Sequence, residues 1–144
     1  MAKAFNTRTS ELNQALESLH FAFRAVVARP DAMLAERGLS RVHHRILYFI
    51  ANRDPLSVND LLKVLGITKQ SLNGPLRQLL ELELVTAVPD PVDGRIKRLK
   101  LTKEGSKLEK ALSGDQRRRF ERVFAQVGPD AEMAWRKVMA LLTL

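Results

Sequence analysis

The chain has 144 residues, of which 45% are apolar, and it carries a net charge of +8 with no cysteine. This length and composition fit one globular domain, and the excess of cations favours an anionic partner, with nucleic acid first. Disulfides, cysteine–zinc sites and thiol redox sensors are excluded. Because no signal-peptide core and no run of ~18 apolar residues is present, we expect a cytoplasmic protein without a membrane partner.

The first part of the chain predicts a long amphipathic helix. From Thr7 onward, apolar side chains recur at helical spacing, at Leu12, Leu16, Leu19, Phe23 and Val26. Proline is favourable at a helix start and glycine at a helix end. We therefore expect a separate short helical piece over residues 29–38, beginning near Pro30 and ending at Gly38.

The middle of the chain is divided by residues that favour helix N-caps, namely Ser40, Ser57 and Thr68. Each precedes an apolar periodic stretch, so we expect helices over 41–53, 58–65 and 69–83. Asp60, three residues after Ser57, predicts a capping-box variant, and Gly66 predicts the end of that helix.

The later part of the chain predicts a hairpin between helices. A strand over 85–88 and a second strand ending at Leu101 flank Asp93–Gly94, a strong hairpin signal in which the glycine accepts a positive φ. Thr102 then caps a long helix that Gly128–Pro129 ends, and a last helix follows.

Two of these helices, joined across 65–68, match a helix-turn-helix unit, whose second helix lies in the major groove of DNA. At about 100° per residue, polar side chains share about a third of the circumference of 69–83. They are Lys69, Gln70, Asn73 and Arg77. Such side chains can read adenine and guanine, whereas a solvated face is more commonly Glu and Lys in mixed order. The leucines gather on another side and predict the core face: Leu72, Leu76, Leu79 and Leu82.

Cations crowd the second strand of the hairpin. Arg95, Lys97 and Arg98 follow the turn, and apolar residues return only at Leu99 and Leu101. A strand that is polar on both faces at its tip projects from the body, where its cations can reach phosphates or the minor groove. An ordinary solvated hairpin is the alternative.

Residues 56–105 resemble the winged helix-turn-helix core of the MarR family of bacterial transcription regulators. The motifs LLKVLGIT, LELELV and above all DPVDGRIKRLKLTKEG carry the resemblance, and the flanking helices extend it over most of the chain. It implies a mainly α fold, an α+β winged helix-turn-helix of about six helices with a small hairpin wing. Within a single domain over 1–144, residues 1–37 and 106–144 would be dimerisation helices and 38–105 the DNA-binding region.

The resemblance also implies site residues. The wing element falls on Asp93 and Arg95, with Arg95 in the minor groove. The recognition helix would contact DNA through Thr68, Lys69, Gln70, Ser71, Asn73 and Arg77, and Lys97 and Arg98 would add wing contacts. The family implies an obligate homodimer that usually represses, and that releases DNA when a small, often aromatic, anion binds.

Three positions depart from the family's pattern. Gly94 stands where many relatives have a second arginine, and Glu83 where relatives usually have a helix-ending glycine. Gly74–Pro75 lies inside the recognition helix, where proline removes a backbone hydrogen bond and clashes with the preceding turn. We expect a kink or a shortened helix there.

The apolar stripes of the terminal helices predict a homodimer interface, with packing within one chain as the alternative. Its residues would be Leu12, Leu16, Leu19, Phe23, Phe120, Val123, Phe124, Trp135, Val138, Met139 and Leu142. An anionic effector would find donors at His20, Arg24 and His43. Packing or surface roles are the more common interpretation of these histidines, and adjacent His43 and His44 cannot chelate one metal on a helix.

No Ser/His/Asp arrangement, phosphate loop or metal-ligand spacing is present, so we expect no enzyme activity, cofactor or metal. The basic run over 116–124 is interpreted as a solvated face, with a DNA-backbone contact as the alternative. The function predicted is sequence-specific regulation of transcription on double-stranded DNA. A winged-helix module that binds proteins without DNA is the alternative, and RNA binding is disfavoured because no aromatic platform is visible.

Overall fold

The computed structural model describes residues 2–144, with side chains from Thr7 onward. The described chain folds into six helices and one antiparallel pair of strands, so the predicted fold class is confirmed. The elements are α1 (Ala2–Ala35), α2 (Arg41–Asn52), α3 (Val58–Leu65), α4 (Lys69–Glu81), β1 (Val85–Pro89), β2 (Lys97–Leu101), α5 (Lys103–Val127) and α6 (Pro129–Leu142).

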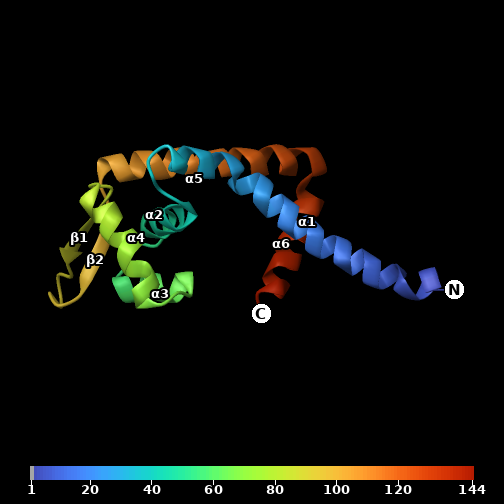
Figure 1. Cartoon of the computed structure of the whole chain (residues 1–144), viewed down its shortest axis with the longest axis horizontal. Helices are drawn as coiled ribbons and strands as arrows, with labels where there is room; N and C mark the ends of the chain where they lie inside the picture. The colour runs from blue at the N-terminus through green and yellow to red at the C-terminus, as the bar shows by residue number, and fades with distance from the viewer. Residues whose placement is uncertain (1) are drawn as a thin grey trace.

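The long helix α5 joins two parts of the molecule (Figure 1). One part, here called the reading lobe, consists of α2, α3, α4 and the β1–β2 hairpin beside the N-terminal half of α5. At the other end of α5, α1 and α6 each pack against α5, and the N-terminal part of α1 extends away from the body (Figure 1). Within residues 2–144, no helix combines the length and apolar content that a membrane span requires.

Helix α1 continues without a break through Pro30, so the predicted separate helix over 29–38 is wrong. Val27, Pro30 and Leu34 are buried, and α1 contacts both α5 and α2. Because this packing holds the helix on both sides of the proline, it outweighs the lost backbone hydrogen bond. The chain leaves α1 after Ala35 and turns through Gly38, whose φ is 70°.

Apolar side chains from α2, α3, α4, β1 and β2 form the core of the reading lobe, together with the ends of α1 and α5. In α4 the predicted leucine face is confirmed at Leu72, Leu76 and Leu79, which are buried. Leu82 is 49% exposed and does not belong to this face. The helix ends at Glu81, so Leu82 lies beyond its last turn.

The predicted caps fix both ends of α3 and the start of α4. Ser57 Oγ accepts the N–H of Asp60 at 3.1 Å, and the Asp60 carboxylate accepts the N–H of Ser57 at 3.0 Å. These bonds lower the pKa of Asp60. Gly66 ends α3 in the left-handed conformation at φ 65°, and Thr68 Oγ1 begins α4 by accepting the N–H of Ser71 at 3.1 Å.

Helix α4 runs without interruption past Pro75, so the predicted shortening is wrong, whereas a kink stays a prediction. Leu72 and Leu79, on either side of the proline, are both fully buried. Core packing therefore holds both halves in one helix, because tertiary contacts supply most helical stability in proteins. As a result, Asn73 and Arg77 share one helix.

The hairpin is anchored at its base and projects at its tip, as predicted. The strands pair from Val85 and Leu101 at the base to Pro89 and Lys97 near the tip. Leu99, 1% exposed, also donates its N–H to Leu56 O at 2.8 Å, which ties β2 to the segment before α3.

The joint between the hairpin and α5 depends on the Leu-Thr-x-x-Gly sequence over 101–105. Thr102 Oγ1 donates to Glu83 O at 2.6 Å and accepts the N–H of Gly105 at 3.0 Å. Gly105 packs so closely against the Leu84 backbone that a Cβ atom would overlap Leu84 O. This joint fixes the position of the hairpin relative to the start of α5.

Glu83→Gly is expected to raise the free energy of unfolding by about 1 kcal/mol, because glycine adopts a left-handed conformation without Cβ strain. Glu83 has φ 57° and is the one non-glycine residue in the described chain with a positive φ. Urea unfolding would measure the change. Glu83→Ala keeps the strain and serves as the control, and a Glu83→Gly variant no more stable than Glu83→Ala would contradict the expectation.

Candidate nucleic-acid interface

The first turn of α4 presents at the surface most of the residues that were predicted to contact DNA. Thr68 and Ser71 engage one another, since Thr68 Oγ1 donates to Ser71 Oγ at 2.9 Å in addition to capping the helix. Lys69, Gln70 and Asn73 are exposed, and no hydrogen bond or ion pair engages their side chains within the described chain. Thr68 and Ser71 thus fix the start of α4, while the other three are available to a ligand.

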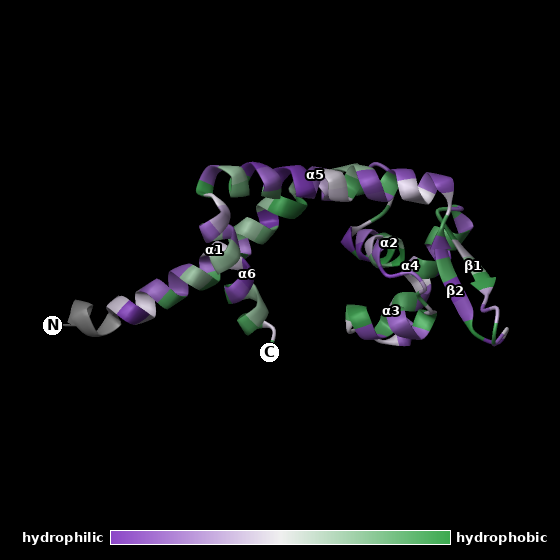
Figure 2. Ribbon diagram, turned by 180° about the vertical axis from the view of Figure 1, so that it is seen from behind, coloured by the Kyte–Doolittle hydropathy of each residue, from purple (hydrophilic) through white to green (hydrophobic). Residues whose placement is uncertain are grey.

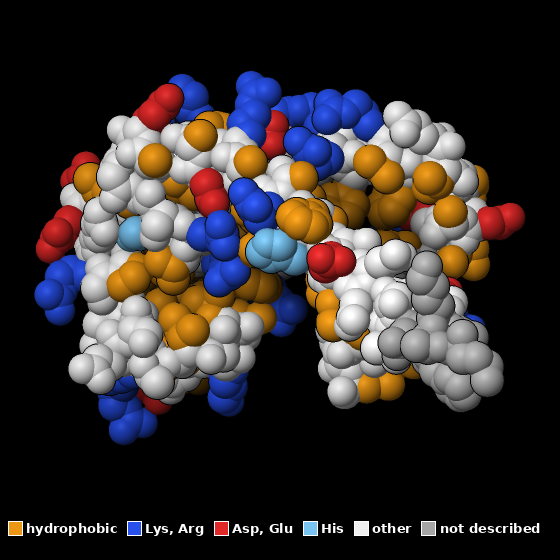
Figure 3. All heavy atoms as spheres, turned by 45° about the vertical axis from the view of Figure 1, so that its right-hand side comes forward, with side chains coloured by type: hydrophobic (Ala, Val, Ile, Leu, Met, Phe, Trp, Pro, Cys, Tyr) orange, Lys and Arg blue, Asp and Glu red, His pale blue; other side chains and the backbone are white. Residues whose placement is uncertain are grey.

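Arg77 is also exposed, one turn after Asn73, whereas the leucine face of α4 is buried. The structure therefore brings the predicted reading residues together on the solvent side of one helix. Figure 3 shows Lys and Arg side chains at the free end of the reading lobe, and a second group along the outer side of α5. Contact of the α4 residues with DNA stays a prediction.

The wing tip holds Arg95 in a defined orientation. Arg95 Nε donates to Asp93 Oδ1 at 3.0 Å and Nη2 to Asp93 Oδ2 at 3.1 Å, and the Arg95 N–H donates to Asp93 Oδ1 at 3.1 Å. This pairing lowers the pKa of Asp93 and raises that of Arg95. The Arg95 side chain is 91% exposed, so a charged group is fixed in place while remaining in solvent.

Asp90 organises the loop behind the tip. Its Oδ1 accepts the N–H groups of Asp93 at 3.0 Å and Val92 at 2.8 Å, and its Oδ2 accepts Arg98 Nε at 2.6 Å. The backbone bonds from Asp93 and Val92, followed by Arg98, lower the pKa of Asp90. Arg98 is thus engaged inside the wing, whereas Arg95 and Lys97 project from it.

Gly94 does not adopt the positive φ that the Asp93–Gly94 pair predicts. The loop spans residues 90–96, with Asp93 O accepting the N–H of Ile96 at 3.0 Å and Ile96 O accepting that of Asp90 at 2.8 Å. Because aspartate side chains order this longer loop, no left-handed glycine is required.

Gly94→Arg is expected to strengthen DNA binding. No heavy atom lies within 4 Å of the place a Cβ would occupy at Gly94. One more cation at the wing tip should steepen the plot of log K against log salt by about 0.9. Titrating a duplex at several salt concentrations would measure this slope, with Gly94→Gln as the uncharged control. Equal slopes for Gly94→Arg and Gly94→Gln would contradict the expectation.

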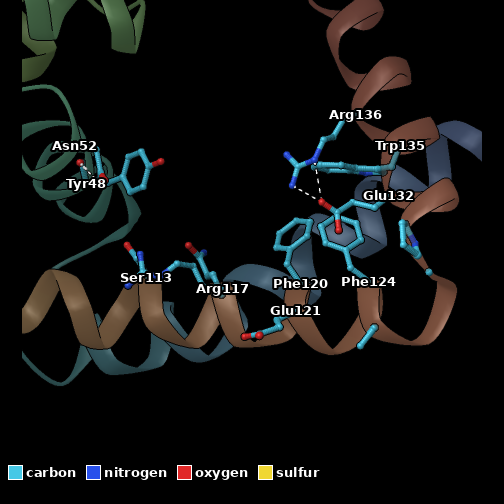
Figure 4. A pocket seen from close by; sticks show the side chains of 14 residues that line it. Tyr48, Asn52, Ser113, Arg117, Phe120, Glu121, Phe124, Glu132, Trp135 and Arg136 are labelled. Carbon is cyan, nitrogen blue, oxygen red and sulfur yellow. Dashed lines mark hydrogen bonds and ion pairs between the residues drawn. The ribbon is translucent and has the colours of Figure 1, made fainter.

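A hollow of about 1040 Å³ lies between α2, α5 and α6 (Figure 4). Phe120, Phe124 and Trp135 form an aromatic wall, with ring centroids 5.4 to 5.6 Å apart. Tyr48 and Asn52 of α2 line the opposite side (Figure 4). The hollow therefore offers apolar rings and hydrogen-bonding groups to one small molecule.

Two arginines line the hollow. Arg136 donates to Glu132 Oε2 from Nη2 at 2.8 Å, whereas Arg117 has no ion pair within the described chain. The predicted effector residues His20, Arg24 and His43 do not line this hollow. Their part in effector binding stays a prediction.

Sequence reasoning missed Tyr48, Asn52, Arg117 and Arg136 as cavity residues. They come from three helices, and only the packing of these helices brings them to one hollow. The i, i+4 spacing of Tyr48 and Asn52 on α2 was the available signal, but it indicates one helix face and no partner.

The predicted dimer residues fall into two groups. Along α1 and α6, apolar residues lie outside the reading lobe (Figure 2), and Leu16, Leu142 and Val138 are 68%, 65% and 53% exposed. Val123 of α5 is also exposed. Phe120, Phe124 and Trp135 instead pack on one another within the chain. Contact of either group with a second copy stays a prediction.

Comparisons with known proteins agree with this geometry. The model of the MarR family matches residues 37–96. The HTH-type transcriptional regulator PetP of Rhodobacter capsulatus is 41% identical over 130 residues, which are 90% of this chain and 78% of that protein. The MarR family transcription regulator SP03579 has a TM-score of 0.76 at 21% identity, covering 97% of this chain and 93% of that chain.

A second solved structure, NadR in complex with 4-hydroxyphenylacetate, has a TM-score of 0.67 at 26% identity, covering 92% of this chain and 89% of that chain. The helix-turn-helix unit, the hairpin wing and the 41% identity to PetP all indicate the same family. The chain therefore belongs to the MarR family of transcriptional regulators and is not an enzyme.

Proposed function

We propose that this regulator binds a pseudo-palindromic site in double-stranded DNA as a homodimer, represses transcription, and releases DNA when a small aromatic anion binds. The observation that carries the proposal is the wing tip, where Asp93 orients an arginine that is 91% exposed. A cation fixed in solvent at the end of a projecting hairpin suits the minor groove, whose negative potential favours arginine. The exposed polar face of α4 would lie in the adjacent major groove.

The homodimer is supported by α1. Its N-terminal part extends away from the body (Figure 1), yet Leu12, Leu16 and Leu19 lie on one side and are 50%, 68% and 53% exposed. Isolated helices have marginal stability in water, so this segment needs an apolar partner. A second copy supplies it with matching apolar faces on α1 and α6. Two recognition helices related by a two-fold axis would contact half-sites about one helical turn apart.

The effector is supported by the hollow between α2, α5 and α6. Its aromatic wall would stack on a ring, and Arg117, which has no carboxylate partner in the described chain, would pair with an acidic group. NadR was solved in complex with 4-hydroxyphenylacetate, a ligand of this class. The hollow adjoins α2 of the reading lobe, so a bound ligand could alter how the lobe is held.

Millimolar 4-hydroxyphenylacetate is expected to raise the melting temperature and to release bound DNA. A ligand that binds only the folded state stabilises it by about 2.7 kcal/mol at one hundred times its dissociation constant. Differential scanning fluorimetry and fluorescence anisotropy would measure the two effects. Arg117→Ala should abolish both, whereas Arg122→Ala, on the same helix but outside the hollow, should keep them. The absence of both effects in the wild-type protein with this compound and with salicylate would contradict the effector proposal.

A further inference from the structure

His43 is buried in the first turn of α2, with 5% of its surface exposed. Its Nδ1 accepts the backbone N–H of Ser40 at 2.9 Å, so the proton of the neutral ring lies on Nε2. Nε2 lies 2.9 Å from Oε1 of Gln78 in α4 and donates to it. Nε2 of Gln78 in turn reaches Gly38 O at 3.4 Å. Because each of these three hydrogen bonds joins a donor to an acceptor, the histidine tautomer and the amide orientation are consistent with one network.

Gln78 lies to one side of the leucines that dock α4 on the core. At about 100° per residue, it is roughly 130° around the helix from the middle of the row formed by Leu72, Leu76 and Leu79. A hydrogen bond placed off this row resists rotation of α4 about its own axis, in addition to the contacts of α4 with α2 and β1. The bond to His43 therefore opposes a rotation that would redirect Asn73 and Arg77.

The other side of the network is attached to α1. Gly38 lies in the turn that leaves α1. Arg41, next to the α2 N-cap residue Ser40, donates to Asp31 Oδ2 of α1 at 2.7 Å. The Arg41 guanidinium also lies over the Phe23 ring of α1, at 5.0 Å from its centroid. The recognition helix is thus tied to the corner between α1 and α2 as well as to its own core.

We propose that His43 and Gln78 act as positioning residues that set the rotation of the recognition helix and thereby its selectivity for the operator. The inference rests on the proposed DNA-binding function, because it assigns to α4 the reading of bases. Selectivity should depend on the bond between the two side chains, whereas non-specific attraction to phosphates depends on charge and should not.

Two substitutions at His43 separate positioning from capping. In His43→Asn the side-chain oxygen can replace Nδ1 as acceptor for the Ser40 N–H, but the side chain is too short to reach Gln78. In His43→Gln the amide nitrogen can replace Nε2 as donor to Gln78, but the Ser40 N–H loses its acceptor. Gln78→Ala removes the acceptor from the other helix and leaves His43 in place.

The experiment measures the ratio of affinities for a selected operator duplex and a scrambled duplex of equal length and salt. Melting curves for each variant choose a temperature at which it is folded. Gln78→Ala and His43→Asn should each lower the ratio by about tenfold, the discrimination of one base contact. The double variant should be no worse than the worse single variant, because both remove the same bond. His43→Gln should keep the ratio within about threefold, even if it melts earlier.

An unchanged ratio in folded Gln78→Ala and His43→Asn would overturn the inference. So would a ratio that falls in step with melting temperature across all variants, His43→Gln included, because a purely structural role predicts that pattern. If Gln78→Ala or His43→Asn does not fold, the other one and His43→Gln still decide the matter. If His43→Gln does not fold, a lower ratio in the other two at an unchanged melting temperature supports positioning, and a ratio that falls only with melting temperature contradicts it. Failure of the wild-type protein to prefer any operator would instead remove the proposed function itself.

Discussion

Arg95→Ala is expected to weaken binding to an operator duplex by about 10- to 100-fold, because charge-assisted hydrogen bonds contribute about 1.5–3 kcal/mol each. Arg95 is the exposed cation that Asp93 holds through two side-chain hydrogen bonds, of 3.0 and 3.1 Å. With Gly94 beside it, no second arginine shares this contact. The slope of log K against log salt should also become shallower by about 0.9, since one cation is lost.

Asn73→Ala provides a matched comparison for Arg95→Ala on the same protein. Asn73 is neutral and lies on the reading face of α4, so its loss should reduce preference for the operator over a scrambled duplex and leave the salt slope unchanged. Anisotropy titrations at four salt concentrations would give affinity and slope for both variants. If Arg95→Ala binds the operator with wild-type affinity and slope, the proposed role of the wing is wrong.

Gly105→Ala is expected to lower the free energy of unfolding by at least about 3 kcal/mol, the upper range for overpacking. A Cβ at this position would overlap the backbone carbonyl of Leu84. That carbonyl also accepts the N–H of Thr102 at 3.1 Å, so it cannot move away without loosening the joint between wing and α5. Backbone atoms, unlike the end of a flexible side chain, have little freedom to yield.

Gly114→Ala is the matched control for Gly105→Ala. Gly114 also lies inside α5, but the nearest atoms to the place of its Cβ are the ends of the Arg118 and Arg117 side chains, at 3.3 and 3.9 Å, which can move aside. Alanine there should stabilise the protein by about 0.5–1 kcal/mol, because glycine in a helix interior is the less favourable residue. Urea unfolding would compare the two variants with the wild type. Similar stability of Gly105→Ala and Gly114→Ala would contradict the account of the joint.

Local chemistry made much of this fold predictable. Ser57 and Thr68 cap α3 and α4 as expected, since a side-chain oxygen beside a free backbone N–H forms its bond within three residues. Gly66 ends α3 in the left-handed conformation for an equally local reason. The polar face of α4 followed from helical geometry alone, and the structure places it in solvent.

The errors arose where distant contacts decide the outcome. Pro30 was expected to begin a separate helix and Pro75 to kink or shorten one, but leucines one turn away are buried in the core and hold each helix together as one element. Gly94 was expected to form a tight turn, but Asp90 and Asp93 order a longer loop. The hollow beside Arg117 was missed because three helices contribute to it.

The partners of the two adjacent histidines were likewise not predictable from the sequence. Adjacent His43 and His44 suggested packing or surface positions, and both are buried. His43 binds Gln78 in α4, whereas His44 Nε2 lies 3.0 Å from Ser113 Oγ in α5, and burial lowers the pKa of His44. The partners lie 35 and 69 residues away in the sequence, so spacing could not reveal them.

The most direct test of sequence-specific binding by a dimer is to select bound fragments from random duplex DNA and to measure the mass of the resulting protein–DNA complex. We expect enrichment of one pseudo-palindrome, with half-sites about one helical turn apart and two chains bound per site. Its affinity should exceed that for a scrambled duplex by at least about a thousandfold. Failure to enrich any sequence would contradict the account and favour a winged-helix module that binds proteins instead of DNA. A complex containing a single chain per site would contradict binding as a dimer.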